Sequence, residues 1–297
     1  MVPPRLGYRL ATRVASAMAK REATMFTTVR ENLRHVLPHA GAEELSRLAE
    51  EAIAHAGRTY YDMFRFSDED YRRGRVPLRV DVEEWRAVRE VLADDRGTVL
   101  VGPHMSNFDM AARWIVAQGF TMQGLSLPQP NTGTRVLNRL RRRSGIEMTP
   151  LDVSALRMAV KRLRQGGIVL TGVDRPVSLM EEPVLFFDAP ARLPTGHVRL
   201  ALQTCSRIVV GCCLLESAVD MSSQGFARTL GKKAALCRPD ELDCCYRIQY
   251  APPLEMEEVG GREESVRHNV MRVLEIIERM IRQAPSQWLM FVPVWDT

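Results

Sequence analysis

The chain has 297 residues and a mass of 33.6 kDa, and its 45% apolar and 26% charged residues exclude a disordered, collagen-like or coiled-coil protein. The longest uncharged stretch, residues 114–134, contains several Gly, Pro and Gln residues and therefore predicts no transmembrane helix. The first twenty residues carry charges throughout and lack the apolar core of a signal peptide. We therefore expect a cytoplasmic protein.

Positive charge is concentrated in two segments. The formal net charge is +5. Residues 1–34 contain seven Lys and Arg against two Glu, and residues 135–164 contain nine against one Glu and one Asp. Such segments are typical of proteins that bind a phospholipid surface, a phosphorylated cofactor or nucleic acid. Charge alone does not choose among these anions.

Residues 1–70 have a helical pattern. Leu10, Val14 and Met18 recur at four-residue steps and are surrounded by arginines. This pattern is compatible with a helix that lies in a membrane interface and equally with a surface helix that packs on its own domain. We keep both interpretations open.

From residue 97 onward, short apolar runs alternate with helical stretches. The predicted strands are residues 97–102, 121–127, 168–173, 183–187, 208–215 and 246–250. The predicted helices are residues 107–118, 135–144 and 155–165, one that begins near residue 195, and residues 263–282. This alternation predicts an α/β fold, with a central mostly parallel or mixed sheet layered by helices. We expect a helical segment at residues 1–70 and an α/β domain at residues 71–297, which together form a single domain.

A histidine and an aspartate follow the first predicted strand of the sheet. His104 comes directly after Gly102 and Pro103, where the chain must turn, and Asp109 stands five residues further on. Ligands gather at the carboxyl ends of strands in α/β sheets. We expect Asp109 to fix the tautomer of His104, so that the other ring nitrogen can take a proton from a substrate hydroxyl. The alternative is that His104 merely caps a helix or satisfies local backbone groups.

Three further polar positions also have both a functional and a structural interpretation. Asp174 and Arg175 end another predicted strand, where the arginine can bind a phosphate or carboxylate and the aspartate can orient it. A salt-bridged loop explains the same residues. His197 lies at a predicted helix start, where an anion site and an ordinary capped helix are both open.

Other chemistries lack their sequence signatures. Ser106 is not flanked by the glycines of a nucleophile elbow. The sequence contains no G-x-G-x-x-G, no P-loop and no C-x-x-C motif. We expect neither a metal ion nor a resident cofactor.

These segments, in this order, resemble the lysophospholipid acyltransferase superfamily. Within it the chain is similar to the branch of bacterial lipid A biosynthesis (lauroyl/myristoyl) and phosphatidylinositol mannoside acyltransferases. The resemblance rests on the H-x4-D block at residues 104–109, the arginine-rich residues 138–145, and residues 173–176, 186–190, 193–196, 284–288 and 291–295.

The resemblance implies a reaction and a set of roles. His104 would be the general base that deprotonates an acceptor hydroxyl for attack on an acyl thioester, and Asp109 would orient it. Four residues would bind substrate: Asn107, Arg142, Asp174 and Arg175. The acyl donor would be acyl-CoA or an acyl carrier protein thioester, and the acceptor a glycolipid or lysophospholipid. The chain lacks the N-terminal membrane helix of the enterobacterial members, so attachment at the cytoplasmic membrane face would be peripheral.

Two alternatives compete with an O-acyltransferase. A non-catalytic lipid-binding protein of the same fold would retain the sheet and the helices without turnover. Nucleic-acid binding through the arginine-rich segment is disfavoured, because that segment lacks interleaved aromatic residues and no zinc-finger or RNA-recognition signature is present.

Overall fold

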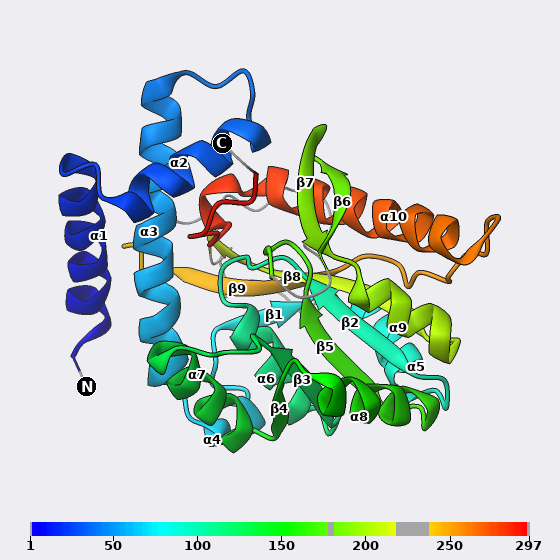
Figure 1. The fold of residues 1–297 in the computed structure, drawn as a ribbon. Coiled ribbons are helices and arrows are strands. Elements are labelled where there is room, and N and C mark those ends of the chain that lie inside the picture. Colours follow the sequence, from blue (N-terminus) through cyan, green and yellow to red (C-terminus); the bar gives the residue numbers. More distant parts are fainter. Residues whose placement is uncertain (1, 178–180, 218–237, 296–297) are drawn as a thin grey trace.

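The computed structural model describes residues 2–177, 181–217 and 238–295 (Figure 1). Helices precede the first strand of the sheet. They are α1 (Pro4–Lys20), α2 (Thr24–Val36), α3 (Ala42–Arg65) and α4 (Asp68–Arg72). The first three form their own small core, in which Phe26, Leu33 and Leu45 are buried.

In the described part of the chain, a seven-stranded sheet has the order β1-β9-β8-β2-β5-β3-β4. Its strands are β1 (Leu78–Val80), β2 (Thr98–Gly102), β3 (Met122–Ser126), β4 (Ile146–Pro150), β5 (Ile168–Gly172), β8 (Arg207–Ser217) and β9 (Cys244–Tyr250). Neighbouring strands are parallel except β8 and β9, which are antiparallel. A separate hairpin consists of β6 (Glu181–Phe186) and β7 (Ala189–Pro194). The predicted α/β class with a mixed central sheet is confirmed.

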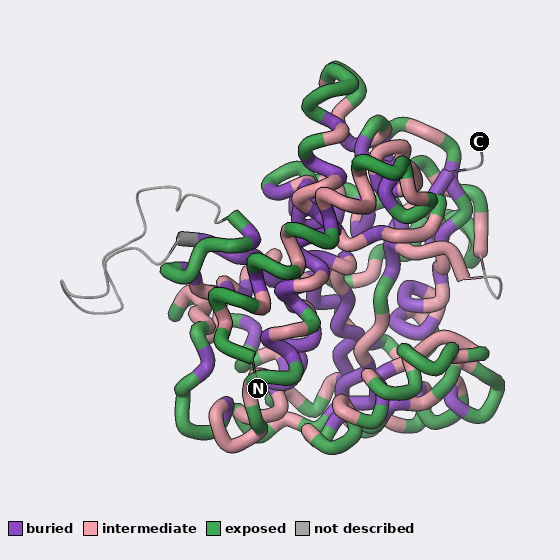
Figure 2. The backbone as a smooth tube through the Cα atoms, turned by 90° about the vertical axis from the view of Figure 1, so that its left-hand side faces the viewer, coloured by how far each residue is buried: buried purple, intermediate pink, exposed green. Residues whose placement is uncertain are grey.

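Helices cover both faces of this sheet. Along β2, Val99 and Val101 pack into one core with α8 (Val153–Arg164), α9 (Gly196–Thr204) and α10 (Arg262–Gln283). Leu100 points to the opposite face, which packs against α5 (Val82–Ala93) and α6 (Phe108–Ala117). This alternation follows from the two-residue period of a strand, and it explains why the strands are apolar throughout. Figure 2 shows the buried strands enclosed by helices with exposed outer surfaces.

Some elements were not predicted. β1 is only three residues long, and β4 alternates buried Ile146 and Met148 with polar or proline residues directly after the arginine-rich helix α7 (Thr132–Arg143). α5 and β7 are likewise absent from the predicted elements. Such short segments become strands because they pair with neighbouring strands: β1 pairs with the longer β9, and β4 pairs with β3.

Helix α1 packs against α3 with one face and exposes the other. The hydroxyl of Tyr8 donates a hydrogen bond to Asp62 Oδ1 over 2.6 Å, and Ala15 is fully buried. On the outer face, Leu6, Leu10 and Val14 are 56%, 60% and 49% exposed. Figure 2 views the molecule from the side on which α1 lies and shows this exposed face. No helix in the described ranges is long and apolar enough to span a membrane.

Candidate active site

The loop between β2 and α6 is held by the C-terminal segment. Ser106 in this loop has a positive φ of 43° and is buried, a conformation that few non-glycine residues adopt. Its backbone N–H donates to Gln287 O over 2.8 Å, and the N–H of Leu289 donates to His104 O over 2.8 Å. The Gln287 side chain is in turn hydrogen-bonded to the backbone of Leu215 in β8. The C-terminal segment therefore attaches this loop, which carries His104, to strand β8 of the sheet.

His104 forms its hydrogen bond with Asp174, which follows β5. The distance from His104 Nδ1 to Asp174 Oδ1 is 2.6 Å. The other carboxylate oxygen accepts two bonds, from the backbone N–H of His104 over 2.8 Å and from the indole N–H of Trp288 over 2.7 Å. With Nδ1 donating to a carboxylate, the second ring nitrogen, Nε2, has a free lone pair.

Asp174 is fully buried, yet it is held as a carboxylate. Burial by itself raises the pKa of this group. The charge and ring N–H of His104, together with the indole N–H of Trp288 and the backbone N–H of His104, outweigh that effect, so the pKa of Asp174 lies below its usual value. An ionised Asp174 stabilises both the Nδ1–H tautomer and the imidazolium that forms when Nε2 accepts a proton.

Asp109 lies in a different pair from the one expected. Both of its oxygens accept hydrogen bonds from Arg141 in α7, from Nε over 2.5 Å and from Nη2 over 2.9 Å. Burial lowers the pKa of Arg141, but the adjacent Asp109 carboxylate outweighs it and raises that pKa. Arg141 also lies over the ring of Phe108, which contacts the ring of His104 edge-on at a centroid distance of 5.2 Å. The hydrogen bonds of the Asp109 carboxylate thus go to Arg141, whereas the Asp174 carboxylate bonds to the imidazole directly.

Two of the expected substrate-binding residues have structural contacts instead. The Asn107 side chain caps α6, accepting from the Met110 N–H over 3.1 Å, and is fully buried outside the cavity described below. Arg142 donates to Met148 O in β4 over 2.9 Å and likewise does not line the cavity. Local capping and a helix–strand tether explain these positions.

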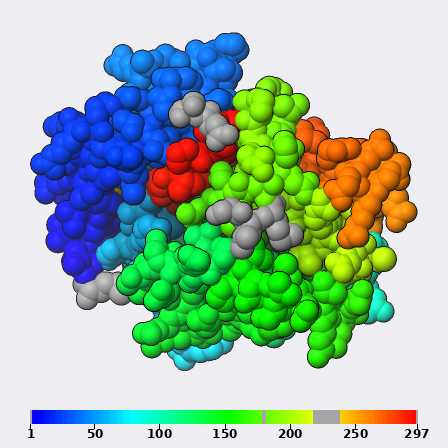
Figure 3. Space-filling model, in the orientation of Figure 1, coloured from blue at the N-terminus to red at the C-terminus, as the bar shows by residue number. Residues whose placement is uncertain are grey.

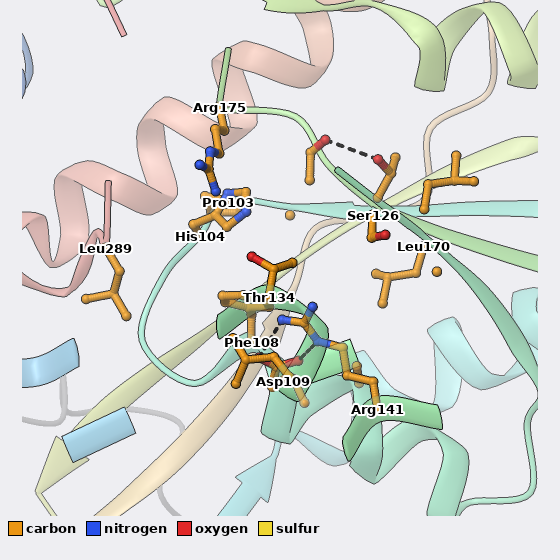
Figure 4. A pocket seen from close by; sticks show the side chains of 18 of the residues that line it. Pro103, His104, Phe108, Asp109, Ser126, Thr134, Arg141, Leu170, Arg175 and Leu289 are labelled. Atoms are coloured by element: carbon orange, nitrogen blue, oxygen red, sulfur yellow. Dashed lines mark hydrogen bonds and ion pairs between the residues drawn. The ribbon is translucent and has the colours of Figure 1, made fainter. Parts of the chain in front are cut away.

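Arg175, in contrast, lines the cavity. Its Nε is buried with no hydrogen-bond partner among the residues that the structure describes. Figure 4 shows its guanidinium close to His104 and Pro103 in that view. A buried N–H without a partner is costly, so this arginine is available to an anionic group of a ligand.

A cavity of about 750 Å³ opens at His104 and extends beneath α6. Its size lies within the range of roughly 300–1,000 Å³ that is usual for small-ligand sites. The polar groups His104, Asp109, Arg141 and Arg175 lie near its opening, whereas Leu100, Ala112, Ile115, Ile146, Met148 and Leu170 line its inner part. Figure 3 shows the face of the molecule on which the N-terminal helices, the C-terminal segment and the region of α7 meet.

Three glycines make room for this site: Gly102 and Gly172 end β2 and β5, and Gly211 lies within β8. Gly102, Gly172 and Gly211 lie on three adjacent strands and all line the cavity. A Cβ atom on Gly172 would lie 2.6 Å from His104 Cε1, so the imidazole occupies the space that any side chain at position 172 would fill. A Cβ on Gly102 would lie 2.2 Å from the carbonyl oxygen of Gly211. The imidazole therefore fits only because position 172 lacks a side chain, and β2 and β8 approach each other closely because position 102 lacks one.

His197 is a buried group that lies outside the cavity. His197 is buried in α9, and burial lowers its pKa to about 4. Its Nε2 has no hydrogen-bond partner within the described residues. It does not line the cavity.

The sequence matches the model of the family described as bacterial lipid A biosynthesis acyltransferase over residues 1–221. The chain belongs to this family. It is also similar to the phosphatidylinositol mannoside acyltransferases of Mycobacterium tuberculosis strain CDC 1551 / Oshkosh and strain H37Rv. Each is 27% identical over 193 residues, which cover 63% of this chain and 61% of the relative. The enzyme of that name from Mycolicibacterium smegmatis is 27% identical over 193 residues, with 63% of this chain and 62% of the relative covered. The alignments thus span about 61% of the length of these relatives.

Sequence reasoning missed the functional contacts of Trp288, Gly172 and Arg141. Trp288 and the arginine-rich segment were recognised as blocks of the family resemblance, but no pattern indicates that an indole would bond to Asp174 or that Arg141 rather than Arg142 would reach the site. The glycine at the end of β5 was visible as the residue two positions before Asp174. Only the packing of the imidazole against it shows why it is glycine.

Proposed function

We propose that the protein is an O-acyltransferase that moves a fatty acyl chain from an acyl thioester to a hydroxyl group of a glycolipid or lysophospholipid. The observation that carries this proposal is the hydrogen bond of 2.6 Å between His104 Nδ1 and the buried carboxylate of Asp174, at the opening of an apolar cavity. Membership in the lipid A acyltransferase family and the similarity to proteins named phosphatidylinositol mannoside acyltransferase support a glycolipid acceptor.

The proposed reaction uses His104 first as base and then as acid. Nε2 accepts the proton of the acceptor hydroxyl while its oxygen attacks the thioester carbonyl. The tetrahedral intermediate then collapses, the carbon–sulfur bond breaks, and the leaving thiolate takes the proton back from Nε2. Asp174 keeps the Nδ1–H tautomer and stabilises the transient imidazolium. The thioester supplies the activated acyl group, so the reaction needs no resident cofactor or metal.

Two parts of the cavity suit two parts of the acyl donor. The inner, apolar part suits the hydrocarbon chain, because each buried methylene contributes about 0.8 kcal/mol. Arg175 lies at the opening with a buried, unpartnered Nε and suits a phosphate, as carried by the pantetheine arm of acyl-CoA or acyl carrier protein or by the acceptor head group. No nucleic-acid role is part of this proposal.

The outer face of α1 supports peripheral attachment to the cytoplasmic face of the membrane. Leu6, Leu10 and Val14 are half-exposed on it, and arginines interleave with them along the helix. Apolar residues flanked by cations are typical of helices that lie in a membrane interface. The other face of α1 packs on α3, as expected of a surface helix that packs on its own domain. The membrane contact of the outer face is part of this proposal.

Vesicle binding tests this attachment. The substitution Leu10→Asp should weaken binding to vesicles containing anionic phospholipid at least tenfold, since burying a leucine side chain is worth about 1.5–3 kcal/mol. Val153→Asp is the matched control, because Val153 is 65% exposed on α8, away from α1. Equal binding of the two variants would contradict the assignment of α1.

The reaction itself is tested with wild type and His104→Ala, using radiolabelled acyl-CoA and acyl carrier protein thioesters with total membrane lipid. A labelled lipid that forms only with wild type establishes the activity and provides its acceptor for identification. If both proteins are folded and bind vesicles but neither transfers label from either donor, the protein is a non-catalytic lipid-binding member of the fold. Near-normal turnover in His104→Ala would refute the role of His104.

A further inference from the structure

Strand register shows on which side the cavity reaches furthest below the carboxyl ends of the parallel strands β2, β5, β3 and β4. Three levels follow from the pairing of the strands, counted from the carboxyl ends downward. Gly102 and Gly172 pair at the upper level. The middle level contains four residues, because Leu100 pairs with Leu170, Leu170 with Gly124, and Gly124 with Met148. The lower level likewise contains four residues, because Thr98 pairs with Ile168, Ile168 with Met122, and Met122 with Ile146.

Only the β4 side of the cavity reaches the lower level. Of the four residues there, Ile146 alone lines the cavity. On the opposite side, Val209 in β8 pairs with Leu100 at the middle level, yet it does not line the cavity. From α6, the lining extends from Phe108 to Ile115, two helical turns or about 10 Å along its axis. On the β4 side, the cavity therefore ends between Ile115 and Ile146.

Gly124 lies on the way to this deep end. It lines the cavity at the middle level, between Leu170 and Met148. A Cβ at this position would lie 2.4 Å from Met148 Sδ and 3.3 Å from Ile146 Cγ2. The thioether is the flexible end of its side chain, so a methyl group at position 124 is accommodated only by moving Met148 or by filling part of the cavity.

Resting on the proposed function, we propose that Gly124 and Ile146 determine the length of the acyl chain that the protein accepts. The end of the chain lies against Ile146 and Ile115, and it reaches them over Gly124 because this residue has no side chain. Filling position 124 shortens the accepted chain, and truncating Ile146 lengthens it.

The test uses Gly124→Ala, Ile146→Ala and a matched control, Ile208→Ala. Ile146 and Ile208 are 1% and 0% exposed, but Ile208 packs on the opposite face of the sheet, so this control reports loss of packing alone. For each protein, the acyl products formed from an equimolar mixture of saturated thioesters are separated by length. Binding of free fatty acids of the same lengths is measured in parallel by displacement of a fluorescent fatty acid.

A change of one methylene in the buried chain corresponds to about fourfold in relative rate or affinity. In Gly124→Ala the ratio of the longest accepted chain to the next shorter one should fall at least fourfold. In Ile146→Ala the ratio for a chain two carbons longer should rise about fifteenfold. Ile208→Ala should keep the wild-type ratios.

The outcomes separate this inference from the proposed function. If wild type binds fatty acids and both site variants shift the length preference, but no protein transfers an acyl group, the inference stands and the acyltransferase proposal fails. If transfer occurs and both site variants retain the ratios of wild type and Ile208→Ala, the inference is overturned and the acyltransferase stands. Binding that is independent of chain length in wild type, or no binding and no transfer, overturns the inference as well.

Discussion

The substitution Asp174→Asn changes the tautomer of His104 while it preserves most of the local packing. One carboxylate oxygen accepts two bonds, from the His104 backbone N–H and the Trp288 indole, and the other accepts one, from His104 Nδ1. The asparagine oxygen should stay where it accepts from the His104 backbone N–H and the Trp288 indole N–H. If the amide turned over, its NH₂ group would face these two donors, and each lost hydrogen bond would cost about 1–3 kcal/mol. In the retained orientation, the NH₂ group donates to Nδ1 and leaves the proton on Nε2.

A His104 that is protonated on Nε2 cannot accept the hydroxyl proton. Restoring the correct tautomer requires the unfavourable amide orientation, and the imidazolium also loses the adjacent negative charge. A comparable carboxylate-to-amide change in a catalytic triad lowers kcat about 10⁴-fold. We expect Asp174→Asn to lower kcat by about 10³–10⁴-fold, with KM nearly unchanged, because Asp174 lies behind the imidazole and outside the cavity lining.

The assay is steady-state acyl transfer with circular dichroism and thermal unfolding as checks of the fold. Asp109→Asn is the informative comparison, because it tests the partner that the sequence indicated. Its main effect should be on stability, since the Arg141 guanidinium, 14% exposed in its side chain, would lose its carboxylate. The role of Asp174 is contradicted if folded Asp174→Asn keeps more than a tenth of the wild-type kcat, or if Asp109→Asn lowers kcat more than Asp174→Asn does.

Two further predictions concern the glycine beneath the imidazole and the buried histidines. Gly172→Ala should lower kcat at least tenfold in a folded protein, because its Cβ would lie 2.6 Å from His104 Cε1 and displace the ring by a distance that catalysis does not tolerate; activity within twofold of wild type would contradict this. Burial lowers the pKa of His55 to about 3 and of His197 to about 4, so below pH 6.5 the unfolded chain binds protons that the folded chain excludes. The free energy of unfolding, measured with urea, should therefore be independent of these groups above pH 6.5. It should fall by about 1.4 kcal/mol per pH unit for each histidine as the pH drops toward 4. A stability that does not change between pH 7 and pH 5 would argue against two buried neutral histidines.

The sequence was sufficient for the fold class and for the position of His104. Apolar runs such as Val99–Leu100–Val101 alternate with amphipathic helices, and this periodicity is a local property that predicts a layered sheet. The turn at Gly102 and Pro103 places His104 at the carboxyl end of β2, where the structure has it. Short elements such as β1 carry too few residues for a pattern, because their stability comes from the strands beside them.

The sequence by itself determined which residue types stand at the ends of the strands, since strand, turn and helix start are encoded by neighbours along the chain. Only the tertiary structure decided which of them meet. Asp109 is five residues from His104, yet it pairs with Arg141, whereas Asp174, seventy residues away, reaches the imidazole because β2 and β5 are parallel neighbours in register. Likewise, Trp288 and the glycines of the sheet acquire their roles from close packing, which brings distant residues within hydrogen-bond distance or requires that a side chain be absent.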